Sequence, residues 1–353
     1  MSATPLRQPR RGHGRATLAD VAAAAGVTAI TVSRYLREPQ RVAPATAESI
    51  GRAIARTGYV PNKQAGALAS AGGGGARMVA ALIPSIANSI FAETVQGLAD
   101  GLAGSGCELL LAATGYSRER EEEQLRALLG WFPSAIVVTG RRHTEGALHL
   151  MRQARARGTP VVEIWDHHPE ARKEGFAQIG FDHAEVGRAM AAHLVERGHR
   201  RLAYVDSGVA EDFRAHERGE GFLAEAKRRR VQALRVVAPQ AEAIEAGRQA
   251  LGSLLDAAGR PRVRAVAFAN DHLACGALLE ARRRALDVPG DLALLGFGDF
   301  ALGRQLDPAL STVRTPRLEI GRAAARALLR ALSEDRPAAG ERLPWQLVER
   351  ATA

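Results

Sequence analysis

The residues with the clearest chemical potential lie in one short segment near the N-terminus. Ile30, Arg34 and Arg37 recur at i, i+4 and i+7, so on a helix they share one outward face. Thr31 lies beside them. Arginine can bind guanine through two hydrogen bonds, isoleucine can contact a thymine methyl group, and hydroxyls can bond phosphates or base edges. The stripe therefore suits the major groove of DNA, and an ordinary solvated helical hairpin is the alternative.

Two short helices joined by a tight turn are expected to position this stripe. Thr17 is a suitable N-cap for the first helix, and Asp20 can complete a capping box with it. Gly26 can adopt the positive φ at which that helix ends. The apolar face of the first helix comprises Leu18, Val21, Ala22 and Ala25.

The second helix is expected to begin after Thr28, to reach about Leu36 and to turn Val32 inward. A third helix is expected over 44–57, because proline suits the first helical position. Gly58 would end it. These three helices would form a small all-α domain.

Charge is concentrated in the N-terminal part of the chain. The 353 residues carry a net charge of +10, and residues 1–76 hold ten Lys or Arg and three Asp or Glu, a net +7. The remaining residues are therefore nearly neutral. A small basic module on a large neutral body is typical of a polyanion-binding head. The length predicts two to three domains.

The sequence offers little support for secretion, membrane insertion or common enzymatic sites. It has no apolar run of transmembrane length and no signal-peptide core, and Cys107 and Cys275 lie far apart, so a soluble cytoplasmic protein without disulfides is expected. No Gly-x-Ser-x-Gly, Walker motif or Cys/His pair occurs. The paired histidines lack further ligands, so neither a metal site nor a cofactor is expected.

From Met78 onward, short apolar runs alternate with amphipathic helical patterns, which predicts parallel sheets built from βαβ units in two lobes. The expected strands are 78–83, 108–112, 135–139, 161–164, 202–205, 234–237, 265–268 and 292–296. The expected helices are 92–104, 120–129, 186–197, 218–229, 244–257, 273–283 and 318–332. A cleft between the lobes is the expected ligand site.

Conspicuous motifs run along nearly the whole chain. In the head they are Thr17–Ala22, Ala25–Val27, Thr31–Arg34 and Gly58–Asn62. In the body they include Ile179–Asp182, Gly198–Arg200, Ala269–Asp271 and Gly296–Asp299. With these motifs the chain resembles the lactose-repressor/galactose-repressor family of bacterial transcription regulators. The segments 160–166, 296–300 and 343–345 resemble its gluconate-repressor branch.

The resemblance implies that two heads read the halves of a palindromic operator, with 28–34 in the major groove. It places Ala29, Ile30 and Arg34 at base-reading positions. It places backbone-phosphate contacts at Thr17, Thr31, Ser33, Thr46 and Asn62. Ala29 offers little for hydrogen-bonded readout, and Ala43 replaces a serine that often caps the third helix.

The resemblance also identifies 62–69 as a hinge helix that forms on operator DNA and inserts Leu68 into the minor groove, with Ala69 beside it. An eight-residue helix containing Gly66 is marginal in water. A simple Ala-rich linker is the alternative. The glycines at 72–75 lack the spaced Lys and Ser of a phosphate-binding loop, and they predict a flexible joint.

In the body, the resemblance implies a small sugar or sugar-acid effector between the lobes. The residues it places near that effector are Asn88, Phe91, Asp166, Arg218, Asn270 and Asp299. Arg218 could hold a carboxylate or phosphate through two hydrogen bonds. Asp271 is expected to cap the following helix instead.

The expected organisation is an all-α helix-turn-helix head on an α/β body of two periplasmic-binding-protein-like lobes with parallel sheets. Its segments are a disordered tail (1–15), the head (16–61), a hinge and linker (62–76) and the body (77–353). The N-lobe would comprise 77–181 and 314–341, and the C-lobe 182–313 and 342–353. A homodimer is expected, because no heptad tail follows Arg350.

The function expected from these features is a repressor of sugar or sugar-acid genes that leaves its operator when effector binds. Two other functions fit a two-lobed body: a sugar-binding receptor of periplasmic type, and a sugar-metabolising α/β enzyme. Neither explains the basic helical head, and the receptor would require a signal peptide.

Overall fold

The computed structural model describes residues 16–59, 77–87, 89–168, 175–334 and 336–353. Contacts divide the chain into two units, 1–76 and 77–353, which are described separately. The N-terminal tail, the predicted hinge helix with Asn62, Leu68 and Ala69, and Asn88 lie outside the described residues.

The head consists of α1 (Leu18–Ala25), α2 (Ala29–Arg37), a short 3₁₀ turn η1 (Pro39–Arg41) and α3 (Pro44–Thr57). The predicted capping box is confirmed, because Thr17 and Asp20 bond each other's backbone N–H. Gly26 and Gly58 end α1 and α3 with φ of 70° and 63°. Ala43 supplies no side-chain cap to α3, as expected.

A small apolar core joins the three helices. Val21 of α1, Val32 of α2 and Ile50 of α3 are each fully buried at its centre. At the edge, Arg56 donates a hydrogen bond of 2.8 Å to the Ala24 carbonyl at the end of α1. The inward positions of α2 are thereby fixed, which leaves its opposite face to solvent.

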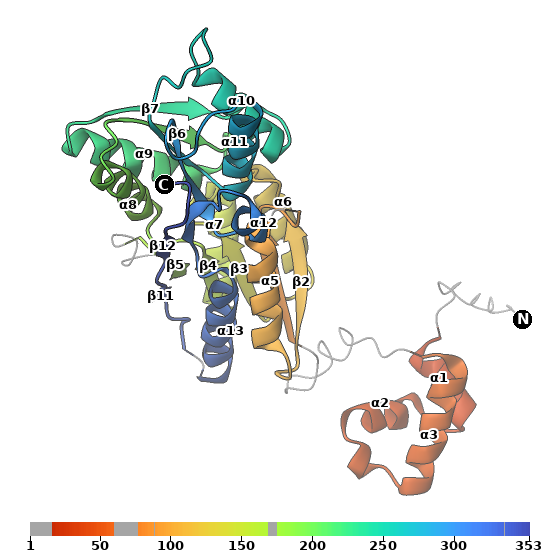
Figure 1. Cartoon of the computed structure of the whole chain (residues 1–353). Helices are drawn as coiled ribbons and strands as arrows, with labels where there is room; N and C mark the ends of the chain where they lie inside the picture. Colours follow the sequence, from red (N-terminus) through yellow and green to blue (C-terminus); the bar gives the residue numbers. More distant parts are fainter. Residues whose placement is uncertain (1–15, 60–76, 88, 169–174, 335) are drawn as a thin grey trace, which may run out of the picture. The chain divides into compact units, whose positions relative to one another are not determined.

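The body contains two six-stranded sheets (Figure 1). The first has the order β11-β5-β4-β3-β1-β2, with all neighbours parallel. Its strands are β1 (Arg77–Ile83), β2 (Cys107–Ala113), β3 (Ala135–Thr139), β4 (Val161–Ile164), β5 (Ala177–Gly180) and β11 (Glu341–Arg342). We call this sheet and its helices the N-lobe.

The second sheet has the order β12-β10-β9-β8-β6-β7 and is parallel except for the β10–β12 pair. Its strands are β6 (Arg201–Asp206), β7 (Gln232–Val237), β8 (Ala265–Phe268), β9 (Ala293–Gly298), β10 (Ser311–Arg314) and β12 (Gln346–Val348). We call this sheet and its helices the C-lobe. The predicted fold class, two parallel-sheet lobes behind a helical head, is confirmed.

Helices cover both faces of each sheet because the central strands are apolar on both sides. Along β1, Val79 and Ala81 face one core cluster, whereas Ala80 and Leu82 face the other. The N-lobe helices are α5 (Ser89–Leu102), α6 (Arg118–Leu129), α7 (Glu145–Ala156) and α13 (Arg317–Glu334). The C-lobe helices are α8 (His183–Glu196), α9 (Phe213–Arg228), α10 (Ala243–Ser253), α11 (Asp271–Arg283) and α12 (Ala301–Gln305).

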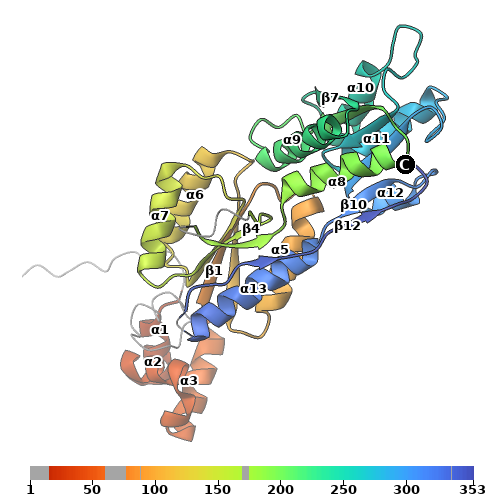
Figure 2. The ribbon, with the colours of Figure 1, turned by 90° about the vertical axis from the view of Figure 1, so that its left-hand side faces the viewer.

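Several helix pairs approach each other unusually closely, and α5 and α13 lie side by side in both views (Figure 2). In the C-lobe, α8 crosses α9 at Gly187, where an added Cβ would collide with the Arg218 carbonyl. Gly221 on α9 packs in the same way against the Ala184 carbonyl. Backbone-to-backbone contact therefore fixes α9 against α8.

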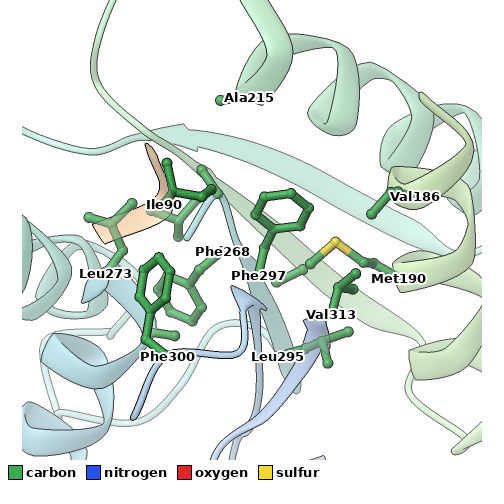
Figure 3. Close-up of a cluster of buried hydrophobic side chains, with 14 of the residues drawn as sticks. Ile90, Val186, Met190, Ala215, Phe268, Leu273, Leu295, Phe297, Phe300 and Val313 are labelled. Carbon is green, nitrogen blue, oxygen red and sulfur yellow. The ribbon is translucent and has the colours of Figure 1, made fainter. Parts of the chain in front are cut away.

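The two lobes share one apolar junction. Figure 3 shows Ile90, from α5 of the N-lobe, beside Leu273 and near Phe268 and Phe297 of the C-lobe. The chain also passes between the sheets three times: after β5, after β10 and between β11 and β12. Among the described residues, no helix is long and apolar enough to cross a membrane.

Candidate DNA-binding surface and ligand cavity

Two residues of the predicted stripe, Ile30 and Arg34, lie on the exposed face of α2, and the side chain of Arg37 is outside the described part of the chain. Ile30 is 73% exposed, an unusual degree for a large aliphatic side chain. Arg34, one turn further along, is also exposed and has no acidic partner among the described residues. Thr28 caps α2, and its hydroxyl lies 2.9 Å from that of Thr31. A guanidinium free of competing carboxylates beside a bare aliphatic group is suited to base edges.

The predicted phosphate contacts are distributed around this face. Thr17 is the N-cap of α1, and Thr46 lies in the first turn of α3. Ala29 is exposed at the start of α2, whereas Ser33 is half-buried on that helix. Helix N-termini present free N–H groups and a positive dipole end, which favour phosphate.

The body encloses a cavity of about 180 Å³ between its lobes. The N-lobe contributes apolar side chains, among them Ile90, Phe91 and Trp165. The C-lobe supplies most of the polar groups: Ser207, Asp212, Arg214, Arg218 and Asn270. A largely apolar cavity with a few convergent polar groups is typical of a small-molecule site.

One wall of the cavity is a chain of aromatic contacts that crosses from lobe to lobe. Phe91 packs edge-on against Trp165 at 5.8 Å, and Trp165 packs against Phe181 at 5.9 Å. Phe181 then contacts Phe297 of the C-lobe at 6.4 Å. Trp165 has a φ of 71°, a strained conformation for a bulky residue that the surrounding packing must maintain.

Arg218 lies in the cavity wall, as predicted, but its guanidinium is already engaged. Nη1 donates to His183 Nδ1 at 2.9 Å, and Nη2 donates to the Ala269 carbonyl at 2.8 Å. Its Cζ lies 3.8 Å from the centre of the Phe297 ring. Two of its five N–H groups are therefore already paired within the protein.

His183 links Arg218 to the N-lobe. Its Nε2 lies 2.7 Å from the Trp165 carbonyl, so Nε2 carries the proton and Nδ1 accepts from Arg218. Burial, with the positive charge of Arg218 nearby, holds the pKa of His183 well below its usual value. The Trp165 indole in turn donates to Thr94 of α5 at 3.1 Å. A continuous hydrogen-bonded path thus joins α5 to α9.

Arg214, one turn before Arg218 on α9, is 5% exposed and lines the same cavity. Its guanidinium lies over the rings of Phe91, at 5.8 Å, and Phe213, at 5.0 Å. Among the described residues it has no hydrogen-bond acceptor. The i, i+4 spacing of Arg214 and Arg218 is visible in the sequence and puts both side chains on one face of α9.

Asp166 does not form part of the cavity wall, contrary to expectation. Its carboxyl is buried behind that wall, 3.6 Å from Arg141 Nε, and its Oδ2 has no hydrogen-bond partner. Burial raises the pKa of Asp166 to about 8, despite the positive charges of Arg214 and Arg141. At neutral pH this carboxyl is therefore mostly protonated.

The N-cap of α11 is Asn270 and not the neighbouring Asp271. Asn270 lines the cavity, as predicted, and it is also the N-cap of α11, with Oδ1 accepting from the Leu273 N–H at 3.0 Å. Asp271 was expected to be that cap, and this is wrong. Its carboxylate instead accepts from the Phe300 N–H at 2.7 Å and from the Thr312 hydroxyl.

Asp299 also lies outside the cavity wall, although it was expected near the effector. Its fully buried carboxylate accepts from three guanidiniums: Arg304, Arg314 and Arg350. Although burial opposes ionisation, these hydrogen bonds hold the pKa of Asp299 below its usual value. The residue joins α12, β10 and the C-terminal segment within the C-lobe.

Ion pairs bridge the lobes beside the cavity. Glu217 of α9 accepts from Arg141 at 2.5 Å and from Arg142 at 2.8 Å, and both arginines belong to the N-lobe. Arg118 of α6 pairs with Glu211 at 3.1 Å. We call the Glu217 contacts the inter-lobe clasp. The clasp therefore joins the two lobes across charged side chains.

Comparison with known families agrees with this architecture. Residues 17–62 match the model described as bacterial regulatory proteins, lacI family. Residues 191–353 match the model described as periplasmic binding protein-like domain.

Whole-chain relatives decide the family. The HTH-type transcriptional regulator GntR of Pseudomonas aeruginosa is 40% identical over 336 residues, covering 93% of each chain. GntR of Escherichia coli K12 is 34% identical over 317 residues, covering 89% of this chain and 91% of its own length. The chain belongs to the LacI family. A solved LacI-family regulator from Silicibacter pomeroyi superposes with a TM-score of 0.85 at 33% identity, covering 96% of this chain and 99% of its own.

The LacI-family protein described here is a DNA-binding transcriptional regulator, and its body is of the sugar-binding type. The relatives named above are transcriptional regulators and not enzymes. In this family member, the structure describes five of the six expected effector residues, all except Asn88. Phe91, Arg218 and Asn270 meet in one cavity, whereas Asp166 and Asp299 do not line it. Sequence reasoning missed Trp165, His183, Ser207, Asp212 and Arg214.

Proposed function

We propose that this regulator represses genes for the use of a sugar acid and leaves a palindromic operator when that compound binds between its lobes. The observation that carries the proposal is the cavity itself, where two buried arginines and Asn270 face aromatic side chains from the opposite lobe. Gluconate is the compound we favour, because the relatives named GntR align with 93% and 89% of this chain and the segments that resemble the gluconate-repressor branch lie in its body.

We propose a division of labour within the head. Ile30 and Arg34 would read base edges in the major groove, with Ala29 against a nearby base. Phosphate contacts would come from Thr17, Thr31, Ser33, Thr46 and Asn62. The exposure of Ile30 and the free guanidinium of Arg34 support this assignment.

The switch would act through spacing. In a homodimer, the two heads must meet the two operator halves at a fixed separation. The segment 62–69, with Leu68 and Ala69 at the minor groove, would fold only when that separation is correct. Effector binding would alter the arrangement of the lobes, and a marginal helix responds to a small change in spacing.

The test is operator selection from random DNA with the full-length protein, followed by titration of the selected duplex. An inverted repeat is expected, and binding is expected to weaken with added salt because phosphate contacts release counterions. Gluconate is then expected to release the duplex. Selection of no inverted repeat would reject the operator model, and release by neutral sugars alone would reject the sugar-acid effector.

A further inference from the structure

We propose that Arg214 binds the anionic group of the effector, and that Arg218 is a positioning residue that holds the cavity wall. This inference rests on the sugar-acid effector proposed above, and it assigns the residue that distinguishes an acid from a neutral sugar. It differs from the expectation drawn from the sequence, which gave the anion to Arg218.

The Arg218 guanidinium is anchored to the protein. Its two terminal nitrogens bond His183 and the Ala269 carbonyl, and the face of its guanidinium lies on Phe297. Two of its five N–H groups are used in these bonds. Because the contacts join α9 to α8 and to the end of β8, they suit a residue that holds the cavity wall in place.

The guanidinium of Arg214, unlike that of Arg218, is not hydrogen-bonded within the described part of the protein. The residue is 5% exposed. Phe91 and Phe213 fix its guanidinium by contacts with the ring faces. A guanidinium that lines a cavity and has no acceptor from the protein is available to form charge-assisted hydrogen bonds with a bound anion. The side chain is therefore held in place for a partner that the protein does not supply.

The neighbouring carboxyls do not supply that partner. Asp166 is protonated at neutral pH for the reason given above, so it does not neutralise Arg214. Asp212, on the cavity wall, is the N-cap of α9 and accepts from the Ala215 N–H at 3.2 Å. Glu217 is committed to the inter-lobe clasp. The cavity therefore keeps a net positive charge beside an apolar wall.

The other polar groups suit hydroxyls. Asn270 uses Oδ1 as a helix cap, which leaves its NH₂ as a donor. Asp212 and Ser207 line the same side of the cavity. Together these groups fit a short polyhydroxy chain with one anionic end. That end is either a carboxylate or a phosphate ester, and both are planar or tripodal acceptors that a guanidinium binds in pairs.

Calorimetry with the full-length protein tests the assignment. The ligands are D-gluconate, D-gluconamide, which replaces the carboxylate with a neutral amide of the same size, and inorganic phosphate. The variants are Arg214→Gln, Arg218→Gln and Lys227→Gln. Lys227 is exposed on the same helix, so its variant removes one positive charge outside the cavity. Operator binding without ligand, measured for each variant, shows that the protein is folded.

Arg214→Gln is expected to weaken gluconate binding by at least about thirtyfold, the usual effect of truncating one partner of a buried charge pair. The amide is expected to bind the variant and the parent equally, so discrimination between acid and amide disappears. Arg218→Gln is expected to weaken both ligands by a similar factor, because it loosens the wall. Lys227→Gln is expected to change neither affinity.

Each other outcome is decisive. Unchanged discrimination in Arg214→Gln, or its selective loss in Arg218→Gln, would overturn the assignment while leaving the sugar-acid effector intact. Binding of phosphate that depends on Arg214, without binding of gluconate, would support the assignment and reject the effector. If no anion binds in an Arg214-dependent manner, the assignment is wrong.

Discussion

The crossing of α8 and α9 gives the sharpest prediction, because one chemical change has opposite effects at two glycines. In Gly187→Ala, the new methyl would meet the Arg218 carbonyl oxygen and lie 2.7 Å from its carbonyl carbon and 2.9 Å from the Phe222 nitrogen. All three are backbone atoms, so the helices must separate. Overpacking of this kind costs about 1–3 kcal/mol.

Gly252 is the matched control. It lies within α10, and nothing approaches within 4 Å of an added Cβ there. Gly252→Ala is therefore expected to stabilise the body by about 0.5–1 kcal/mol, through the better helix propensity of alanine. The expected changes in the free energy of unfolding have opposite signs in the two variants. The comparison therefore does not depend on an accurate absolute value for the parent protein.

Urea unfolding followed by tryptophan fluorescence measures both effects. The three tryptophans, Trp131, Trp165 and Trp345, all belong to the body, so the signal excludes the head. Gly187→Ala should also lose ligand affinity, because moving α9 displaces Arg218 from its bonds at 2.8–2.9 Å. If both alanine variants gain stability, the close backbone approach of α8 and α9 is refuted.

Three further predictions follow from the described contacts. Arg34→Ala is expected to cost about 1–3 kcal/mol of operator binding and to relax the preference for one base pair. Ile30→Ala is expected to lose the preference for thymine at a second base pair. Titration of operator duplexes with single-base changes measures both effects. Glu217→Gln, measured by small-angle scattering and calorimetry, is expected to open the lobes and weaken ligand by about three- to thirtyfold, and an unchanged scattering profile would contradict the role of the inter-lobe clasp. Although burial alone would lower the pKa of His143, hydrogen bonds and charges from Glu121 and Glu163 raise it to about 9. A raised folded-state pKa means that this stabilisation is complete below about pH 6.5 and is lost as the pH rises through 9, a change of roughly 3 kcal/mol. In His143→Gln, the free energy of unfolding measured by urea titration should therefore fall less between pH 7 and pH 9 than it does in the parent protein.

Local patterns predicted much of the fold. Each of the eight expected strands is present within two residues of its expected ends, because a central strand of a parallel sheet is a continuous apolar run. The strands that were missed, β5, β10, β11 and β12, are short and carry polar residues. Long-range pairing with neighbours stabilises them, and no local pattern records that pairing. The helices α7 and α12 were not among the expected helices either.

The site was less predictable, for a related reason. Residue types indicated an anion-binding cavity, but the partners that decide each role are distant in sequence. Arg218 is engaged by His183, 35 residues away, and by Ala269, 51 residues away. Asp299, which does not line the cavity, accepts a hydrogen bond from Arg350, and these two residues are also 51 positions apart. The cap of α11 was expected at Asp271 rather than at the adjacent Asn270, because asparagine and aspartate are equally good N-caps and the local pattern does not separate them.

The first turns of α9 have an evolutionary consequence. Arg214, Glu217 and Arg218 fall within five consecutive positions, and they meet, respectively, the cavity, the opposite lobe and the cavity wall. After gene duplication, substitutions in this short stretch would alter which metabolite a paralogue senses without changing its promoter recognition. Effector specificity and operator specificity can therefore evolve independently in descendants of this chain.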